Sequence, residues 1–138
     1  MKQKTSELTG VALDWAVAKC EGLEPFNDTI SWLVDIDGQY VGMPWYSVNW
    51  EQGGAIIERE WLDVTPWPNE SDEDMRWQCK QHDTTNGCTQ YGPTPLIAAM
   101  RCYVASKLGD EVEVPDELQP PLTPTEYDLA LPVNKLHH

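Results

Sequence analysis

The segment from Thr94 to Gly109 constrains the fold most, because it carries the start signal, the apolar interior and the stop signal of one helix. Thr94 can accept a hydrogen bond from a main-chain N–H, and Pro95 suits the first helical position, where the N–H has no partner. Gly109 suits the end of a helix. We therefore predict a helix over 96–108, with Arg101 and Lys107 near the edges of a buried stripe that consists of Leu96, Met100, Tyr103, Val104 and Leu108.

A second helix is predicted between Gly10 and Glu21. Thr9, or alternatively Ser6, can cap its start, and Gly22 can end it in the left-handed conformation. Its apolar face repeats at the i, i+3, i+4, i+7 spacing of an amphipathic helix and consists of Leu13, Ala16, Val17 and Cys20.

Between Thr29 and Val64 the residues become β-branched and aromatic, which favours strands. One strand is predicted over 29–34, and a turn at Asp37-Gly38 leads into another over 39–41. A further strand is predicted over 55–62, after the flexible pair Gly53-Gly54. Short turns join antiparallel neighbours, so we expect an antiparallel sheet of three or four strands.

The remaining segments are polar or rich in proline. Residues 65–90 are interpreted as a long surface excursion with one short strand near 75–80, and residues 110–115 alternate like an exposed strand. Residues 119–138 are predicted to be an extended tail that ends in a purification-tag remnant. The fold class is therefore α+β: one domain over 1–118, in which two amphipathic helices pack on a small antiparallel sheet.

Charge narrows the possible partners. The chain of 138 residues has 23 Asp and Glu against 9 Lys and Arg, and its formal net charge is -14. A chain without clustered basic residues is not expected to bind nucleic acid directly. No stretch approaches the ~18 apolar residues of a membrane span, and the first residues lack the apolar core of a signal peptide, so we expect a soluble cytoplasmic protein.

The four cysteines are expected to be reduced, because they are too few and too unevenly spaced for a disulfide framework. Cys20 and Cys102 fall on the apolar faces of the two predicted helices. Cys79, His82 and Cys88 supply three ligands where a structural zinc site needs four. We therefore expect no metal and no cofactor.

Several separated blocks of the sequence, in this order, resemble the NinX family of phage-encoded proteins: residues 5–10, 12–18, 52–54, 56–58 and 92–101. The resemblance covers most of residues 1–118. The function of this family is unknown, so the resemblance implies a phage or prophage accessory protein made inside a bacterium, and no activity. Its members end soon after the segment that matches 112–118, and the proline-rich tail departs from that pattern.

Catalysis has no sequence support. The chain lacks the Gly-x-Ser-x-Gly elbow, the phosphate-binding loops and the His-Glu-x-x-His helix. Without the tag pair, His82 is the only histidine. Chance pairs among 23 carboxylates carry little information. We expect a protein that is not an enzyme.

Binding of a small anionic molecule, such as a nucleotide used in host antiviral defence, is the favoured hypothesis. Trp45, Tyr46 and Trp50 could stack on a base, beside Gly53 and Gly54, which would let a ligand approach the main chain. A helix start with free N–H groups suits a phosphate. The phosphate side of this candidate site consists of Tyr91, Gly92, Thr94, Arg59 and Arg101.

A basic host protein is the alternative partner. An acidic surface attracts basic partners, and the contact regions would be Glu70–Asp74 and Asp110–Asp128. The opposing interpretation is that such runs are solvated surface. The sequence does not distinguish a monomer from a homo-oligomer.

Overall fold

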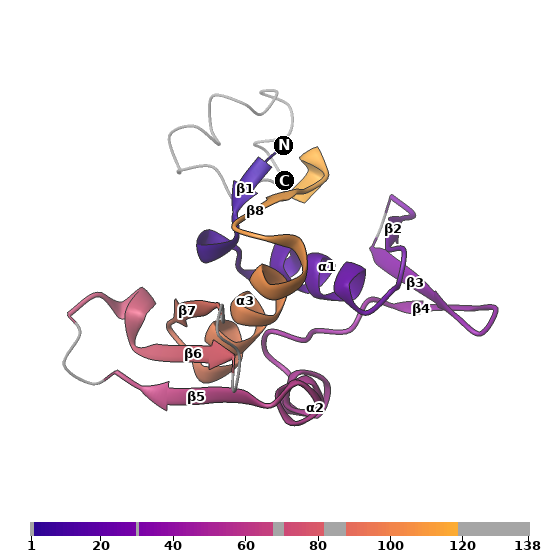
Figure 1. Ribbon diagram of the computed structural model, residues 1–138. Coiled ribbons are helices and arrows are strands. Elements are labelled where there is room, and N and C mark those ends of the chain that lie inside the picture. The colour runs from indigo at the N-terminus through magenta and orange to yellow at the C-terminus, as the bar shows by residue number, and fades with distance from the viewer. Residues whose placement is uncertain (1, 30, 68–70, 82–87, 119–138) are drawn as a thin grey trace, which may run out of the picture.

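The computed structural model describes residues 2–29, 31–67, 71–81 and 88–118. These residues form three α-helices, three short 3₁₀ helices and three small antiparallel sheets (Figure 1). The predicted α+β class is confirmed. The proposed tail over 119–138 lies outside the described residues, as does His82.

The third helix, α3 (Pro95–Leu108), forms the centre of the molecule. It lies between α1 (Gly10–Cys20) and a sheet of three strands, β5 (Leu62–Pro66), β6 (Trp77–Gln81) and β7 (Thr89–Gly92) (Figure 1). It also contacts α2 (Trp50–Glu60). The predicted start is confirmed, because Thr94 Oγ1 accepts a hydrogen bond from the N–H of Ile97 at 3.1 Å. Every residue from 96 to 105 is buried, so α3 is enclosed on all sides rather than along one stripe. Leu108, assigned to that stripe from the sequence, is exposed.

The first helix, α1 (Gly10–Cys20), ends as the sequence predicts. Gly22 has φ +84°, and the N–H groups of Gly22 and Leu23 bond to the carbonyls of Lys19 and Ala18. This pair of bonds is a Schellman motif. At the other end Thr9 occupies the predicted N-cap position, but its side chain does not make the expected capping bond. The alternative, Ser6, belongs to the 3₁₀ helix η1 (Thr5–Glu7).

Two of the sheets lie at the periphery of this helical centre (Figure 1). The hairpin of β3 (Trp32–Ile36) and β4 (Gln39–Gly42) turns at Asp37 and Gly38, and β2 (Phe26–Asn27) adds to it. Both turn residues have positive φ, the geometry expected for an Asp-Gly hairpin. A second sheet pairs β1 (Lys2–Lys4) with β8 (Glu111–Glu113), which confirms the strand predicted after Gly109.

The third sheet consists of β5 (Leu62–Pro66), β6 (Trp77–Gln81) and β7 (Thr89–Gly92), and one of its faces packs on α3. The strand β6 is close to the one predicted at 75–80. The interpretation of 65–90 as a surface excursion is wrong where β5 and β7 form. The short helices η2 (Glu73–Met75) and η3 (Asp116–Leu118) complete the described chain.

The strand predicted over 55–62 is wrong. Residues Trp50–Glu60 form a helix, α2, and the strand β5 begins only at Leu62. Asn49 caps the helix by accepting a hydrogen bond from the N–H of Glu51 at 2.8 Å. The glycines are therefore interior helical residues, and packing explains the first of them: a Cβ at Gly53 would clash with the carbonyl oxygen of Tyr46 and lie 2.7 Å from Leu96 Cδ2.

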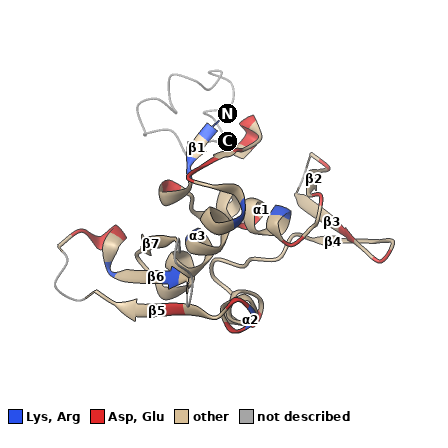
Figure 2. Cartoon of the chain, in the orientation of Figure 1, with Lys and Arg blue, Asp and Glu red and all other residues tan. Residues whose placement is uncertain are grey.

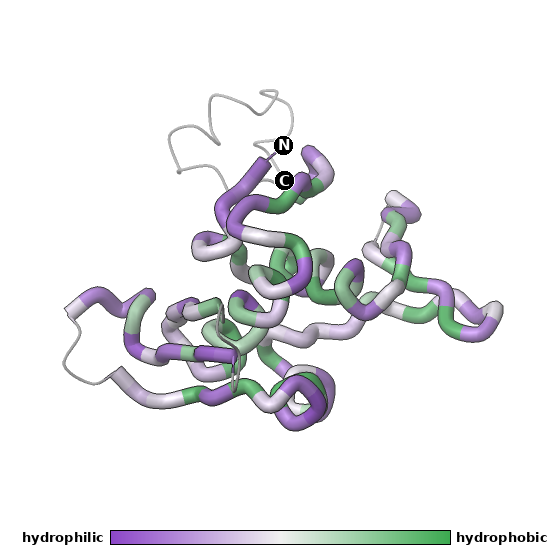
Figure 3. Tube along the Cα trace, viewed as in Figure 1, coloured by the Kyte–Doolittle hydropathy of each residue, from purple (hydrophilic) through white to green (hydrophobic). Residues whose placement is uncertain are grey.

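Charge and hydropathy follow this architecture. Acidic residues occur on α2, on β5 and at the β3–β4 turn, whereas α3 carries few charged residues (Figure 2). Apolar residues are concentrated in α1 and α3, and they also occur on the hairpin of β3 and β4 (Figure 3). In the described part of the chain no helix is long and apolar enough to span a membrane.

Candidate functional site

The three aromatic residues of the predicted stacking site do not share one environment. Trp45 and Trp50 are 67% and 57% exposed, whereas Tyr46 is buried in the core. Burial, with the nearby carboxylates of Glu21 and Asp14, raises the pKa of Tyr46 to about 12. Tyr46 is therefore a core residue, and only the two tryptophans are available to a binding partner.

Arg59 is engaged by carboxylates. Its guanidinium donates two hydrogen bonds to Glu21, of 2.6 and 3.0 Å, and Nε donates to Glu60 at 2.9 Å. Nη2 also lies 3.1 Å from the hydroxyl of Tyr103, which donates to Glu21. The Arg59 hydrogen bonds hold the pKa of Glu21 below its ordinary value, although partial burial opposes them. This network joins α2 to α1 and α3.

Arg101 was placed near the edge of its helix from the sequence, and this is wrong, because its side chain is only 3% exposed. Nε donates to the carbonyl oxygen of Leu8 at 2.8 Å. Nη1 donates to the carbonyl oxygen of Tyr91 at 2.8 Å and to Asp74 at 3.1 Å. Arg101 thus links α3 to three other segments, and the hydrogen-bond acceptors that it contacts are groups of this chain rather than of a ligand.

The predicted phosphate side of the site lies at the β7–α3 junction. A Cβ at Gly92 would lie 2.6 Å from the N atom of Ala98, so the strand packs against the helix at this point. The Tyr91 hydroxyl accepts a hydrogen bond from Gln78 at 3.0 Å, and its ring contacts Trp67 edge to face. Tyr91, Gly92, Thr94 and Arg101 are therefore brought together, and the contact between Gly53 and Leu96 places α2 against the same turn of α3.

Three cysteines lie around the sheet. Cys79 and Cys102 are buried, and the Cys102 thiol donates to the carbonyl oxygen of Cys88 at 3.4 Å. A hydrogen bond with Cys102, and burial, raise the pKa of Cys79 far above its ordinary value. Among the described residues no group of three potential ligands could hold a metal ion. That observation does not test the set with Cys79 and Cys88, because His82 lies outside the described residues.

Asp14, which the sequence did not single out, is a buried acid on α1. Its carboxylate accepts a hydrogen bond from the N–H of Ser47 at 2.8 Å and so fixes the turn that leads into α2. Burial raises the pKa of Asp14, although the bond from Ser47 opposes this effect.

Helix α2 carries an apolar stripe, which we call the α2 stripe: Trp50, Gly54, Ile57 and Trp61, spaced i, i+4, i+7 and i+11. The two tryptophans are exposed, whereas Ile57 is half-buried and packs against the core. Trp61, the C-cap residue, is 71% exposed. A Cβ at Gly54 would lie 3.4 Å from Cε3 of Trp50, so the indole extends along the helix over this glycine. Glu51 and Glu58 come directly after the stripe residues Trp50 and Ile57 in the sequence, and both are exposed.

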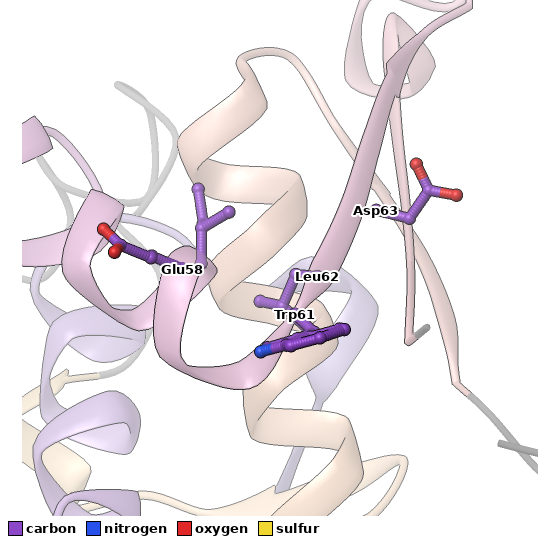
Figure 4. A pocket seen from close by; sticks show the side chains of 5 residues that line it. Glu58, Trp61, Leu62 and Asp63 are labelled. Atoms are coloured by element: carbon purple, nitrogen blue, oxygen red, sulfur yellow. The ribbon is translucent and has the colours of Figure 1, made fainter. Parts of the chain in front are cut away.

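A wide, open depression of about 730 Å³, which we call the α2–β5 pocket, lies at the C-terminal end of the stripe, where α2 joins β5. Trp61 has φ +55°, a left-handed conformation that is uncommon for a bulky residue. Figure 4 shows its indole between the side chains of Glu58 and Asp63, which point away from each other. The pocket therefore has apolar and aromatic walls and acidic flanks, and it is lined by Ile57, Glu58, Trp61, Leu62 and Asp63.

Two signals in the sequence indicate this helix. Asn49 is a favoured N-cap residue, and Gln52 three positions later completes a capping-box pattern. Trp50 and Ile57 are also seven positions apart, the helical spacing. The glycine pair and the β-branched pair Ile56-Ile57 oppose both signals, because they favour a flexible segment followed by a strand.

Comparisons with known proteins agree with this architecture. The family described as Bacteriophage P22, NinX matches residues 4–107. The structure is similar to the 2.0 Å crystal structure of a phage protein from Bacillus cereus ATCC 14579, with a TM-score of 0.52 and 21% identity over 68% of this chain and 87% of that one. No curated protein matches the chain. Because the family match spans most of the sequence, the chain belongs to the NinX family of phage proteins.

Proposed function

We propose that this NinX-family protein acts without catalysis, by binding a basic protein of the bacterial host through the α2 stripe. The observation that carries the proposal is the exposure of two tryptophans, Trp50 and Trp61, at the two ends of one helix face. Exposed tryptophans are costly in water, and they are enriched where proteins bind one another.

The arrangement of the stripe supports a protein partner. Trp50 and Trp61 lie at the two ends of α2 with the half-buried Ile57 between them, and this length suits a protein surface better than a single small molecule. Trp45 adds a further exposed ring immediately before the helix. Such a row of aromatic and aliphatic anchors resembles the apolar face of a helix that docks in a groove.

Charge indicates the class of partner. Glu51, Glu58 and Asp63 are exposed beside the stripe, and the net charge of the whole chain is -14. Complementary charge accelerates association and disfavours partners of the same sign. A basic protein, including one that binds nucleic acid, fits this surface.

The hypothesis of a small anionic ligand stays a prediction. The two arginines that it requires are engaged: Arg59 by Glu21 and Glu60, and Arg101 by Asp74 and two carbonyl oxygens. A phosphate would have to displace these partners or share them. The protein-partner hypothesis requires no such rearrangement, and for that reason we favour it.

Affinity capture from lysate of the bacterial host, with the tagged protein as bait, tests the proposal. Wild type should retain a basic protein, and Trp50→Ala should lose most of it, because truncation of a central aromatic anchor typically costs ~2 kcal/mol or more of binding free energy. Glu58→Lys should slow association with the partner. Added salt should lower the association rate of the wild type towards that of this variant.

Two matched variants control for the location of the surface. Val11→Ser changes an exposed apolar residue on α1, and Glu73→Lys reverses a charge in the acidic run that the sequence suggested as a contact region. Both should retain the partner. A partner that is lost equally from all four variants, or from none of them, would refute binding at the α2 stripe.

A further inference from the structure

We propose that two copies of this chain associate by antiparallel pairing of their β4 strands, so that the β2–β3–β4 sheets of both copies join into one continuous sheet. The paired edge is the strand Gln39–Gly42. This inference goes beyond the proposed function, because it concerns a different surface and a second copy of the chain. It depends on three properties of β4: its exposure, its lack of charge, and a register in which the strand is complementary to itself.

The strand β4 is exposed along its whole length. Each of its four residues is exposed, and Tyr40 is 70% exposed, whereas Val34 on the neighbouring strand β3 is fully buried. The hairpin extends away from the helical centre (Figure 1). Among the strands of the described residues β4 pairs only with β3, so its other edge is open. Small sheets of short strands are marginally stable by themselves, so a further strand along this edge would stabilise the hairpin.

The open edge of β4 lacks the residues that normally protect an edge strand. Proteins block exposed edges with charged side chains and proline. The edge strands of the other two sheets carry such residues: Lys2 and Lys4 on β1, Glu111 and Glu113 on β8, and Asp63 and Pro66 on β5. By contrast, residues 38–50, which include β4, contain no charged side chain, and β4 itself contains no proline.

This lack of charge indicates which partner fits the edge. The net charge of the whole chain is -14, yet a basic partner finds no carboxylate on β4. A second copy of the strand meets no like charge there. The acidic residues of the hairpin are Asp35 on β3 and Asp37 at the turn, and the Asp35 carboxylate accepts a hydrogen bond from the N–H of Gly38 at 2.9 Å. Two acidic chains can therefore approach each other at this uncharged edge.

The hydrogen-bond pattern of the hairpin determines which main-chain groups face the open edge. Residues of an antiparallel strand bond to the neighbouring strand at alternate positions. The N–H of Met43 donates to the carbonyl oxygen of Trp32 at 3.0 Å, so positions 43, 41 and 39 bond to β3. Tyr40 and Gly42 lie between these positions, and they therefore direct their N–H and C=O groups to the open edge.

These outward groups make β4 complementary to a second copy of itself. Antiparallel pairing about Val41 places Tyr40 of each copy opposite Gly42 of the other, and every outward N–H and C=O group of the two strands is then bonded. A Cβ at Gly42 would have no atom within 4 Å, so the space over this glycine is open. The ring of Tyr40 from the second copy can cover it, as aromatic residues do opposite glycines in sheets. The two Val41 side chains meet at the closely spaced position of the ladder.

The small size of the contact determines its strength. One short strand on each side buries much less than the ~1,600 Å² of a standard interface. We therefore expect a weak dimer that forms as the protein concentration rises, not an obligate one. Sedimentation velocity on the intact protein should show a weight-average mass that increases with concentration from one chain towards two. A mass that stays at one chain, or that rises beyond two, would overturn the inference.

Matched lysine variants locate the interface. Val41→Lys places two ammonium groups opposite each other, where like charges destabilise a strand pair, and should weaken self-association about fivefold or more. Ile36→Lys makes the same kind of change at a residue of similar exposure, 42% against 38%, on the strand that does not form the edge. It should dimerise as the wild type does. Thermal unfolding of both variants verifies the fold. Equal self-association of the two variants would overturn the inference.

Cysteine variants test the register and do not depend on loss of the dimer. In the proposed pairing the two Cα atoms at position 41 lie ~4.5 Å apart, within the range of a disulfide. With oxidised glutathione as the oxidant, Val41→Cys should form a covalent dimer under conditions in which Ile36→Cys and the wild type, with its own four cysteines, do not. Equal cross-linking of the two variants, or none at position 41, would overturn the antiparallel pairing of β4.

Salt distinguishes a second copy from a basic partner. Two chains that each carry a net charge of -14 repel each other, and salt screens this repulsion. Added salt should therefore strengthen the self-association of the wild type, whereas it slows the association of a basic partner. Self-association that becomes weaker in salt would contradict pairing through an uncharged edge.

The two proposals can fail separately. Val41→Lys should retain the captured host protein, and Trp50→Ala should retain the dimer. If Trp50→Ala abolishes self-association, the copies meet at the α2 stripe and the inference on β4 is refuted. If Trp50→Ala loses the host protein while Val41→Lys dimerises as the wild type does, the inference on β4 is refuted and the proposed function stands.

Discussion

The carbonyl oxygen of Tyr46 occupies the position that a Cβ at Gly53 would need, so the start of α2 can pack on the preceding turn only because residue 53 is a glycine. Leu96 closes the same space from α3, 2.7 Å from that Cβ position. The glycine next to it has a different environment. A Cβ at Gly54 would meet only Trp50, at an ordinary contact distance of 3.4 Å.

The two glycines therefore predict opposite effects of alanine. Gly53→Ala should lower the free energy of unfolding by about 1–3 kcal/mol, because it overpacks a closed site. Gly54→Ala should raise it by about 0.5–1 kcal/mol, because alanine is the better helix former. Urea unfolding measures both effects. Stabilisation by Gly53→Ala would show that the helix does not pack on the turn in this way.

Arg101 should be essential to stability and intolerant of lysine. Its guanidinium donates to Leu8, Tyr91 and Asp74 from a buried position, and the single ammonium of lysine lacks that geometry. We expect Arg101→Lys to lower the free energy of unfolding by ~2–4 kcal/mol. Chemical denaturation is the measurement, and Arg76→Lys, at an exposed arginine, is the control. A fully stable Arg101→Lys protein that had lost nucleotide binding would instead favour the small-ligand hypothesis.

Asp14 should make the protein more stable on mild acidification. Burial raises the pKa of its carboxyl in the folded state, so the folded protein binds the proton more tightly than the unfolded chain does. The free energy of unfolding should therefore increase as the pH falls from above the raised pKa of Asp14 towards the ordinary aspartate pKa of about 3.9. Urea unfolding at a series of pH values isolates this contribution by comparing the wild type with Asp14→Asn.

Asp14→Asn keeps an oxygen that can accept from the Ser47 N–H and removes the titration. This variant should be at least as stable as the wild type at neutral pH, and its advantage should shrink as the pH falls. Asp14→Ala, which removes the acceptor, should lose about 1–3 kcal/mol at every pH. A strongly destabilised Asp14→Asn variant at neutral pH would contradict the raised pKa.

The helices α1 and α3 and the Asp37-Gly38 hairpin were predictable, because each carries local signals that agree with its packing. Thr94, Pro95 and Gly109 delimit α3, and a turn with positive φ at both positions favours Asp-Gly. Helix α2 was missed because its glycines and β-branched residues favour other structures locally. The helix is instead favoured by the close packing of Gly53 on two residues. One is Tyr46, whose position depends on the turn before the helix, and the other is Leu96, which is distant in the sequence.

The candidate site could be predicted only in part. Trp45 and Trp50 are exposed, as a stacking site requires, but Tyr46 beside them turns into the core because Asp14 fixes the turn at Ser47. The burial of Arg101 depends on the carbonyl oxygen of Leu8, 93 positions away, and no local pattern indicates it. Trp61 was assigned to the predicted strand over 55–62, and its exposed position at the end of α2 depends on the junction between α2 and β5.

Site-specific photo-cross-linking in the bacterial host tests whether the α2 stripe binds a basic host protein. A benzophenone amino acid replaces Trp50 on the α2 stripe, and in a matched protein it replaces Val11 on α1, also an exposed residue. We expect a covalent adduct with a basic host protein from position 50 that is absent from position 11 and is lost when Glu58→Lys is added. No adduct from position 50, or the same adducts from both positions, would refute binding at the α2 stripe.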